Sequence, residues 1–134
     1  MSVALFLITH EGIASNLIAV AEAVIKKKSQ NLSYTEIPMD ADLDMVSDAI
    51  EKRLAQLDTK QGILFLTDIY GSSPSNITMR LAEKHHAHMI SGVNLPMIIR
   101  LLNYRDEAED GLIEKALSGA KKGIQDNFFV TSSS

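Results

Sequence analysis

The sequence predicts an α/β domain with a mostly parallel, four-stranded sheet and flanking helices on both faces. Two short apolar runs, residues 3–8 and "GILFLT" at 62–67, lack the alternation of a half-exposed strand. Both are therefore expected to be strands buried on two faces. Strand and helix patterns alternate four times along the chain, which favours parallel pairing. The 134 residues, 46% of them hydrophobic, suffice for a single domain over 1–134 with one core.

The first half of the chain supplies two strands and two helices. After the strand at 3–8, apolar residues at helical spacing predict a helix over 12–28. Residues 32–37 alternate and stop at Pro38, which favours a shorter strand near an edge of the sheet. Residues 42–57 carry apolar side chains on one face and predict a second helix.

The second half repeats this alternation after the buried strand at 62–67. A proline at the first turn suits a helix that runs from 74 to about 84. A fourth short strand is expected at 87–91, and a helix over 96–102 follows the turn "GVNLP".

The C-terminal part is expected to contain a last helix and a tail. The helix is predicted over 106–125, interrupted by Gly111 and Gly119. The segment "NFFV" at 127–130 allows a further C-terminal edge strand. Its adjacent phenylalanines would point to opposite faces of a strand, which favours a homodimer in which the tail lies against the partner. The end "TSSS" at 131–134 is typical of a frayed terminus.

Charge and composition exclude several classes of function. The formal net charge of −4 gives no support to a nucleic-acid partner or an anionic membrane surface, which call for a basic excess. The chain has no cysteine, so disulfides, thiolate nucleophiles and cysteine metal sites are excluded. No apolar run approaches the roughly 18 residues that span a bilayer, and the N-terminus lacks the features of a signal peptide. A cytoplasmic protein without direct membrane insertion is expected.

Three of the expected strand ends carry small or polar residues that would meet at one edge of a parallel sheet. They are "THEG", "TDIYGSSPSN" and "SGVNLP", and such sheets bind ligands beyond the carboxyl ends of their strands. His10 follows the first buried strand as Asp68 follows the other, so the two side chains can meet if these strands are neighbours. An aspartate that accepts from one imidazole N–H leaves the other ring nitrogen free as a nucleophile. A histidine that ends a strand and an aspartate that caps a turn are the plainer interpretations.

The serine-rich loop is a candidate anion site. Gly71 permits close approach of the backbone, and Ser72, Ser73 and Ser75 offer hydroxyl groups before a helix N-terminus. Taken alone, this stretch is better explained as an ordinary serine N-cap. The glycine-rich nucleotide motifs are absent, so no nucleotide cofactor is expected.

Two other chemistries have weaker support. His85 and His88 could share a helix face as metal ligands, but no further ligand follows at a standard spacing, so surface histidines are favoured and no metal is expected. Serine-hydrolase chemistry lacks the GxSxG turn and the usual order of residues along the chain.

The three motifs together resemble the mannose-type enzyme IIA domain of the bacterial phosphoenolpyruvate-dependent sugar phosphotransferase system. "THEGIASNL", "DIYGSSPSN" and "GVNLPMIIRLL" match the signatures of that family in order and spacing. The resemblance covers residues 3 to about 125. It implies a mostly parallel sheet flanked by helices, usually in a homodimer with a C-terminal strand that can cross to the partner.

The resemblance also implies roles for individual residues. His10 would accept a phosphoryl group from the carrier protein HPr and pass it to a IIB component, with Asp68 holding the imidazole. The serine that precedes proline in the family's loop falls on Ser73, and Gly71 and Ser72 join it as phosphate-binding candidates. The loop that closes the site would contribute Gly92, Asn94 and Pro96.

Two positions depart from the family pattern. Ser72 stands where a second glycine is usual, and Ser75 stands where a bulky apolar residue is usual. Both alter the rim on which a protein partner would dock. Since no IIB domain or linker follows within the 134 residues, a carrier that serves a separate IIB and a stand-alone regulatory phosphoprotein both remain open. A binding domain without chemistry is less favoured, because His10 and Asp68 are present.

Overall fold

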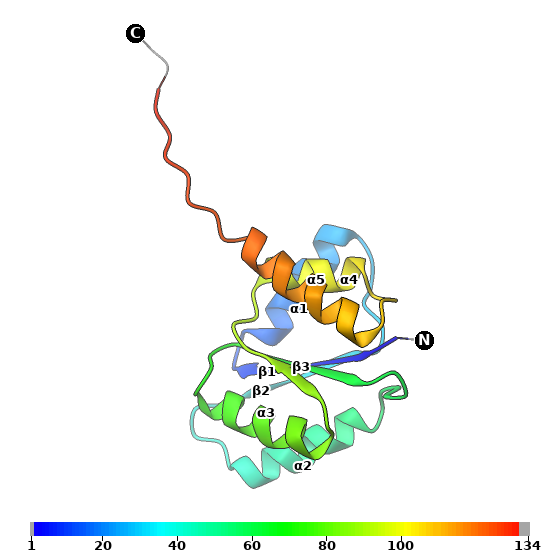
Figure 1. Cartoon of the computed structure of the whole chain (residues 1–134). Helices are drawn as coiled ribbons and strands as arrows, with labels where there is room; N and C mark the ends of the chain where they lie inside the picture. The colour runs from blue at the N-terminus through cyan, green and yellow to red at the C-terminus, as the bar shows by residue number, and fades with distance from the viewer. Residues whose placement is uncertain (1, 132–134) are drawn as a thin grey trace.

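The computed structural model describes residues 2–131 and consists of one four-stranded parallel sheet between two layers of helices (Figure 1). The strands, in the spatial order β2-β1-β3-β4, are β1 (Ala4–His10), β2 (Leu32–Ile37), β3 (Ile63–Thr67) and β4 (His88–Ile90). The helices are α1 (Ala14–Ile25), α2 (Leu43–Leu54), α3 (Ser73–Lys84), α4 (Leu95–Asn103) and α5 (Glu109–Lys122). Within residues 2–131, none of the helices is long and apolar enough to cross a lipid bilayer. The predicted fold class is confirmed.

Both faces of the sheet are covered, which explains the unbroken apolar runs. Helices α1, α4 and α5 pack on one face, and α2 and α3 on the other (Figure 1). In β1, Leu5 and Leu7 enter the core under the first layer, while Phe6 and Ile8 enter the core under the second. All four side chains are fully buried. A strand between two cores has no solvent face, so it shows no polar alternation.

The ends of α1 differ from the prediction for backbone reasons. Gly12 adopts a φ of +87°, which turns the chain sharply before the helix begins at Ala14. Lys26 adopts a left-handed φ of 58°, which ends the helix at Ile25. The short alternating strand β2 lies at an edge of the sheet, as its pattern predicted.

The predicted interruption of the last helix is wrong, because α5 runs without a break through both glycines. Gly119 is needed for packing: an added Cβ would lie 2.6 Å from the Arg100 Cβ of α4. A glycine inside a helix weakens it by only about 1 kcal/mol. The close contact of α4 with α5 offsets that cost.

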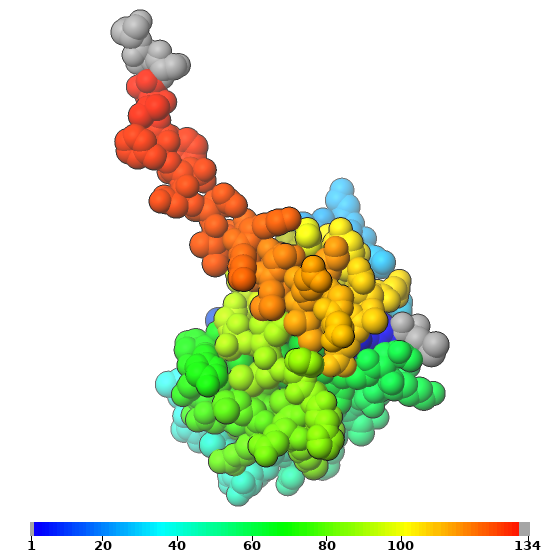
Figure 2. All heavy atoms as spheres, viewed as in Figure 1, coloured from blue at the N-terminus to red at the C-terminus, as the bar shows by residue number. Residues whose placement is uncertain are grey.

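The predicted C-terminal edge strand at 127–130 is also wrong for the described chain. The segment after Gly123 is extended and leaves the body of the domain without pairing to any described strand (Figures 1 and 2). Phe128 and Phe129 are 90% and 87% exposed. The reason is geometric, since the tail leads away from the sheet and does not run beside any of the described strands (Figure 1). Of the frayed end expected at 131–134, residues 132–134 lie outside the described residues.

The two glycines of α5 should respond oppositely to the same substitution. Gly119→Ala is expected to lower the free energy of unfolding by about 1–3 kcal/mol, because the new methyl group meets the Arg100 Cβ, which cannot rotate away. Gly111→Ala meets only the carboxyl end of Glu107, which can rotate, so the gain in helix propensity should leave stability equal or higher by up to about 1 kcal/mol. Urea denaturation of both variants measures the difference. Equal destabilisation in the two would contradict this account of the α4–α5 contact.

Candidate functional site

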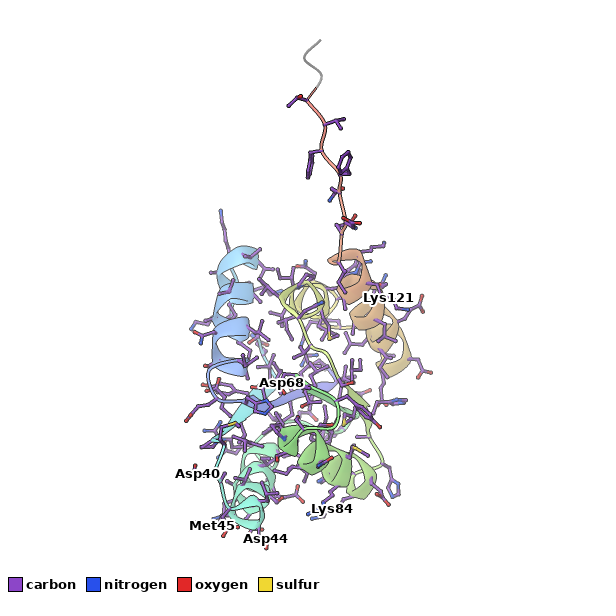
Figure 3. The ribbon with its side chains drawn as sticks, turned by 90° about the vertical axis from the view of Figure 1, so that its left-hand side faces the viewer. Asp40, Asp44, Met45, Asp68, Lys84 and Lys121 are labelled. Carbon is purple, nitrogen blue, oxygen red and sulfur yellow. The ribbon has the colours of Figure 1, made fainter. Side chains whose placement is uncertain are left out.

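His10 and Asp68 meet at the carboxyl edge of the sheet. Strands β1 and β3 are parallel neighbours with Ile8 opposite Thr67, so the residues that follow them lie side by side. The Nδ1 atom of His10 lies 2.8 Å from Oδ2 of Asp68, and the His10 backbone N–H donates to the same oxygen over 2.9 Å. Figure 3 looks onto this edge and places Asp68 near its centre, between the two helix layers. The juxtaposition predicted for the two residues is present.

The charge state of Asp68 determines the tautomer of His10. Burial alone would raise the pKa of the Asp68 carboxyl, but hydrogen bonds from the His10 backbone, the His10 ring and the Ile69 backbone outweigh it, and the net pKa is lowered. The carboxylate is thus ionised at neutral pH and can only accept. The proton of a neutral His10 ring must then sit on Nδ1, which leaves the lone pair of Nε2 free.

The turn after His10 is held by two residues that sequence reasoning did not single out. The Thr9 hydroxyl donates to the His10 carbonyl over 2.9 Å and accepts from the Ala14 N–H over 3.0 Å. The Glu36 carboxylate accepts from the N–H and hydroxyl of Ser15, at 2.8 and 2.7 Å, and these bonds lower the pKa of Glu36. The N-terminus of α1, which could have bound an anion, therefore already holds a carboxylate. The contact between Glu36 and Ser15 could not be predicted from a local sequence pattern, because 21 residues separate the two.

The serine loop has a more specific arrangement than its sequence suggested. Ser72 is the N-cap of α3, and its hydroxyl donates to the Ile69 carbonyl over 2.6 Å. Ser75 is buried, and its hydroxyl accepts from the Gly71 N–H over 3.2 Å. These bonds occupy the hydroxyl of Ser72 and the N–H of Gly71. Among residues 2–131, the N–H and the hydroxyl of Ser73 have no hydrogen-bond partner, and Ser73 is exposed at the first position of α3.

The loop before α4 is joined to the strand end that carries Asp68. The N–H of Gly92 donates to the Asp68 carbonyl, and the N–H of Val93 donates to the Thr67 carbonyl, both over 3.0 Å. Asn94 caps α4 by accepting from the Met97 N–H over 2.9 Å. Pro96 occupies the first turn of α4. The three loops predicted to form one site are thus joined by hydrogen bonds at the carboxyl end of the sheet.

The histidines near the end of α3 lie apart from this edge. The Nε2 atom of His85 lies 2.7 Å from Oε1 of Glu51, and Nε2 of His88 lies 3.6 Å from Oε1 of Glu109. Within the part of the chain that the structure describes, no group of three potential ligands could hold a metal ion. These histidines are therefore explained by single carboxylate partners.

The chain matches one protein family over most of its length. The EIIA-man family model, described as "PTS system fructose IIA component", matches residues 4–117. The mannose-specific EIIAB component of the phosphotransferase system from Escherichia coli K12 is 30% identical over 128 residues, which cover 93% of this chain. The match covers only 39% of that relative.

Solved structures of similar length have the same fold. The mannose/sorbose-specific IIA subunit from Enterococcus faecalis superposes with a TM-score of 0.83 at 18% identity, over 99% of this chain and all of the other. Component EIIA from Streptococcus agalactiae superposes with a TM-score of 0.80 at 21% identity, over 92% of this chain and 96% of the other. At these identities the agreement concerns the fold.

Asp68→Asn should lower stability in a pH-dependent way. A carboxyl with a lowered pKa in the folded state stabilises the fold above its unfolded pKa of about 4, and this contribution is lost as pH falls through the lower folded value. The variant should therefore be about 1–2 kcal/mol less stable than the parent at pH 7, with a difference that shrinks below pH of about 4. Denaturation across pH measures the difference, and Asp48→Asn at an exposed position of α2 is the matched control. A difference for Asp68→Asn that persists unchanged at low pH would point to lost packing instead.

Proposed function

This chain belongs to the EIIA-man family of phosphotransferase-system IIA components, and we propose that it is a phosphocarrier whose phosphoryl acceptor is His10. The observation that carries the proposal is the bond between Nδ1 of His10 and Oδ2 of Asp68 at 2.8 Å. It orients the ring, keeps the proton on Nδ1 and leaves Nε2 as the nucleophile. The His10 side chain is 27% exposed, so a donor protein can reach it.

The proposed phosphoryl transfer needs no cofactor, because one N–P bond forms as another breaks. Nε2 of His10 attacks the phosphorus of a phosphohistidine on HPr, so that the new N–P bond forms as the donor's N–P bond breaks. The proton on Nδ1 stays in place, and the Asp68 carboxylate balances the positive charge that develops on the ring. The same steps in reverse order deliver the phosphoryl group to a IIB component and return His10 to its starting state.

The phosphoryl oxygens need hydrogen-bond donors, and the start of α3 offers them. Ser73 has a free N–H and a free hydroxyl, and the positive end of the helix dipole lies behind them. Gly71 has no side chain and adopts a φ of +87°, so the loop leaves the approach open. Ser72 supports the site indirectly, because its hydroxyl holds the loop by bonding the Ile69 carbonyl. We assign Gly92, Asn94 and Pro96 to the loop that closes this edge.

The proposed partners are HPr as donor and a IIB component as acceptor, and the proposed location is the cytoplasm. The alternative of a stand-alone regulatory phosphoprotein is not favoured, because the matching relatives include a mannose-specific EIIAB component and a fructose-specific EIIA component of the phosphotransferase system.

We further propose a homodimer joined by the C-terminal tails. The tail carries Phe128 and Phe129 in an extended, exposed segment (Figure 2). The two sheet edges differ in their capacity to accept it. At β2, Arg53 bonds the Tyr34 carbonyl and stacks 5.7 Å from the Tyr34 ring, which blocks added strands. At β4, the outer edge lacks a neighbouring strand among residues 2–131. A tail from a second copy along β4 would pair this edge and cover the aromatic rings.

His10→Ala should abolish labelling. Incubation with phosphoenolpyruvate, enzyme I and HPr, followed by intact mass measurement at neutral pH, should add one phosphoryl group to the parent and none to the variant. His85→Ala is the matched control, since His85 also pairs with a carboxylate, at 2.7 Å, and should label like the parent. Retained labelling of a folded His10→Ala protein would refute the assignment.

Removal of the tail should dissociate the dimer. Truncation after Asp126 deletes both exposed phenylalanines, so sedimentation at micromolar concentration should show a monomer for the truncated chain and a dimer for the parent. Truncation after Val130 keeps the aromatic residues and serves as the control that stays dimeric. A parent protein that sediments near its chain mass of 14.7 kDa would exclude the dimer.

A further inference from the structure

An apolar groove adjoins the turn that follows His10. It lies between α1 and the first residue of α4 and has a volume of about 220 Å³. Helices α1 and α4 are neighbours in the layer that Figure 3 shows above the sheet. The lining consists of Gly12, Ile13, Asn16, Leu17, Val20 and Leu95. Since Gly12 follows His10 by two residues, the groove begins at the candidate transfer site.

The groove presents apolar side chains to solvent. Ile13 and Val20 are 39% and 46% exposed, and Leu17 and Leu95 are half-buried. Asn16 is the one polar side chain in the lining, and its amide group donates to the Gly12 carbonyl over 2.7 Å. Contiguous exposed apolar surface marks sites of protein association, whose centres are apolar and whose rims are polar.

Direct transfer of a phosphoryl group requires the donor protein to cover this groove. The donor's phosphohistidine must reach Nε2 of His10, and a specific contact buries about 800 Å² on each partner, which is a disc of roughly 16 Å radius. Val20 comes six residues after the start of α1, about 9 Å along the helix axis, so the groove lies inside that disc. The tail pairing proposed along β4 leaves the groove open, because α1 packs on β1 and β2.

The charges at this end of the sheet indicate the chemistry of the partner's rim. No lysine or arginine occurs in the four segments at the carboxyl ends of the strands, residues 9–16, 36–48, 67–76 and 90–97. Carboxylates are exposed there at Glu11, Asp40 and Asp44. In Figure 3, Asp40 and Asp44 lie on the opposite side of Asp68 from Lys121, which stands at the end of α5. A basic partner surface is therefore attracted to this face, and an acidic one is repelled.

We propose that the groove binds an apolar side chain of the donor protein HPr, and that the surface of HPr around this side chain is basic. The inference rests on the proposed transfer from HPr to His10, but it concerns the binding of the two proteins and not the chemical step. Val20 is the central apolar contact, and the exposed carboxylates attract the basic rim.

Calorimetric titration of the full chain with HPr, both proteins unphosphorylated, tests the docking without any phosphoryl transfer. Val20→Gln should raise the dissociation constant about five- to thirtyfold, because it puts an amide at the apolar centre of the contact. Val24→Gln is the matched control and should bind like the parent. Val24 is likewise an exposed valine of α1, but it lies outside the lining and one turn, about 6 Å, farther from His10. Glutamine suits a helix at least as well as valine does, so α1 should persist in both variants.

Two further measurements separate docking from a general disturbance of the site. Salt at about 0.3 M should weaken the binding of HPr to the parent relative to about 0.05 M, because it screens the charged rim. In the labelling assay, Val20→Gln should be slower by the same factor as its binding at HPr concentrations below KM, and it should recover at saturating HPr. A maximal rate that stays low would show that the substitution disturbs His10 itself and would overturn the docking role.

The proposal is overturned by undetectable binding of HPr to the parent, by parent-like binding of Val20→Gln, by equal weakening in Val24→Gln, or by binding that salt does not weaken. Dissociation of a dimer by Val20→Gln in sedimentation would also overturn it and would assign the groove to a second copy of the chain. Labelling of His10 together with parent-like binding of Val20→Gln would leave the phosphocarrier proposal intact. Binding of HPr in the groove without labelling of His10 would refute the phosphocarrier proposal alone.

Discussion

The parallel register between β1 and β3 is the constraint on which the rest of this structure depends. It sets Ile8 opposite Thr67, so that His10 and Asp68, which lie within two residues of this pair, come together at the carboxyl end of the sheet. The same register directs alternate side chains of both strands into the two cores, where Phe6 and Phe65 meet with ring centroids 6.3 Å apart. A slip of one residue would exchange the two faces of a strand and separate the histidine from its carboxylate. Core packing thus holds the geometry of the candidate site.

Two carboxylates at the carboxyl end of the sheet, those of Asp68 and Glu36, have different hydrogen-bond partners. Asp68 bonds the ring and backbone of His10, and its lowered pKa keeps it charged. Glu36 bonds the first turn of α1 and neutralises a helix N-terminus that would otherwise compete for an anion. The start of α3 follows the loop that carries Asp68, and Ser73 there has a free N–H and a free hydroxyl among residues 2–131. The start of α1 is thus closed by a carboxylate, whereas Ser73 at the start of α3 keeps its donors free among residues 2–131.

The two lateral edges of the sheet, formed by β2 and β4, differ from each other, and so do the carboxyl and amino ends of its strands. The carboxyl end holds the loops of the candidate site, while the amino end is tied by Arg105, whose guanidinium bonds the start of β2. Laterally, Arg53 bonds the Tyr34 carbonyl of β2, whereas β4 has only three residues and no strand on its outer side among residues 2–131. A domain with one covered edge and one open edge can add a strand on one side alone, which limits the ways in which two copies can associate.

The sequence by itself determined the fold class and the principal pair of residues. Runs of apolar residues at 3–8 and 62–67 predict strands buried on both faces, and the positions of His10 and Asp68 just after these runs allow their contact if the two strands are neighbours. The local pattern of apolar residues carries this information, because the pattern reflects which faces of a strand are buried. Only the tertiary structure decided which hydroxyls are free: those of Ser72 and Ser75 are bonded within their loop, and that of Ser73 has no hydrogen-bond partner among residues 2–131. The role of Glu36 and the unbroken helix through Gly119 were likewise hidden, because each depends on a neighbour that is distant in sequence. The course of residues 124–130, which pair with none of the described strands, could not be read from the local pattern either.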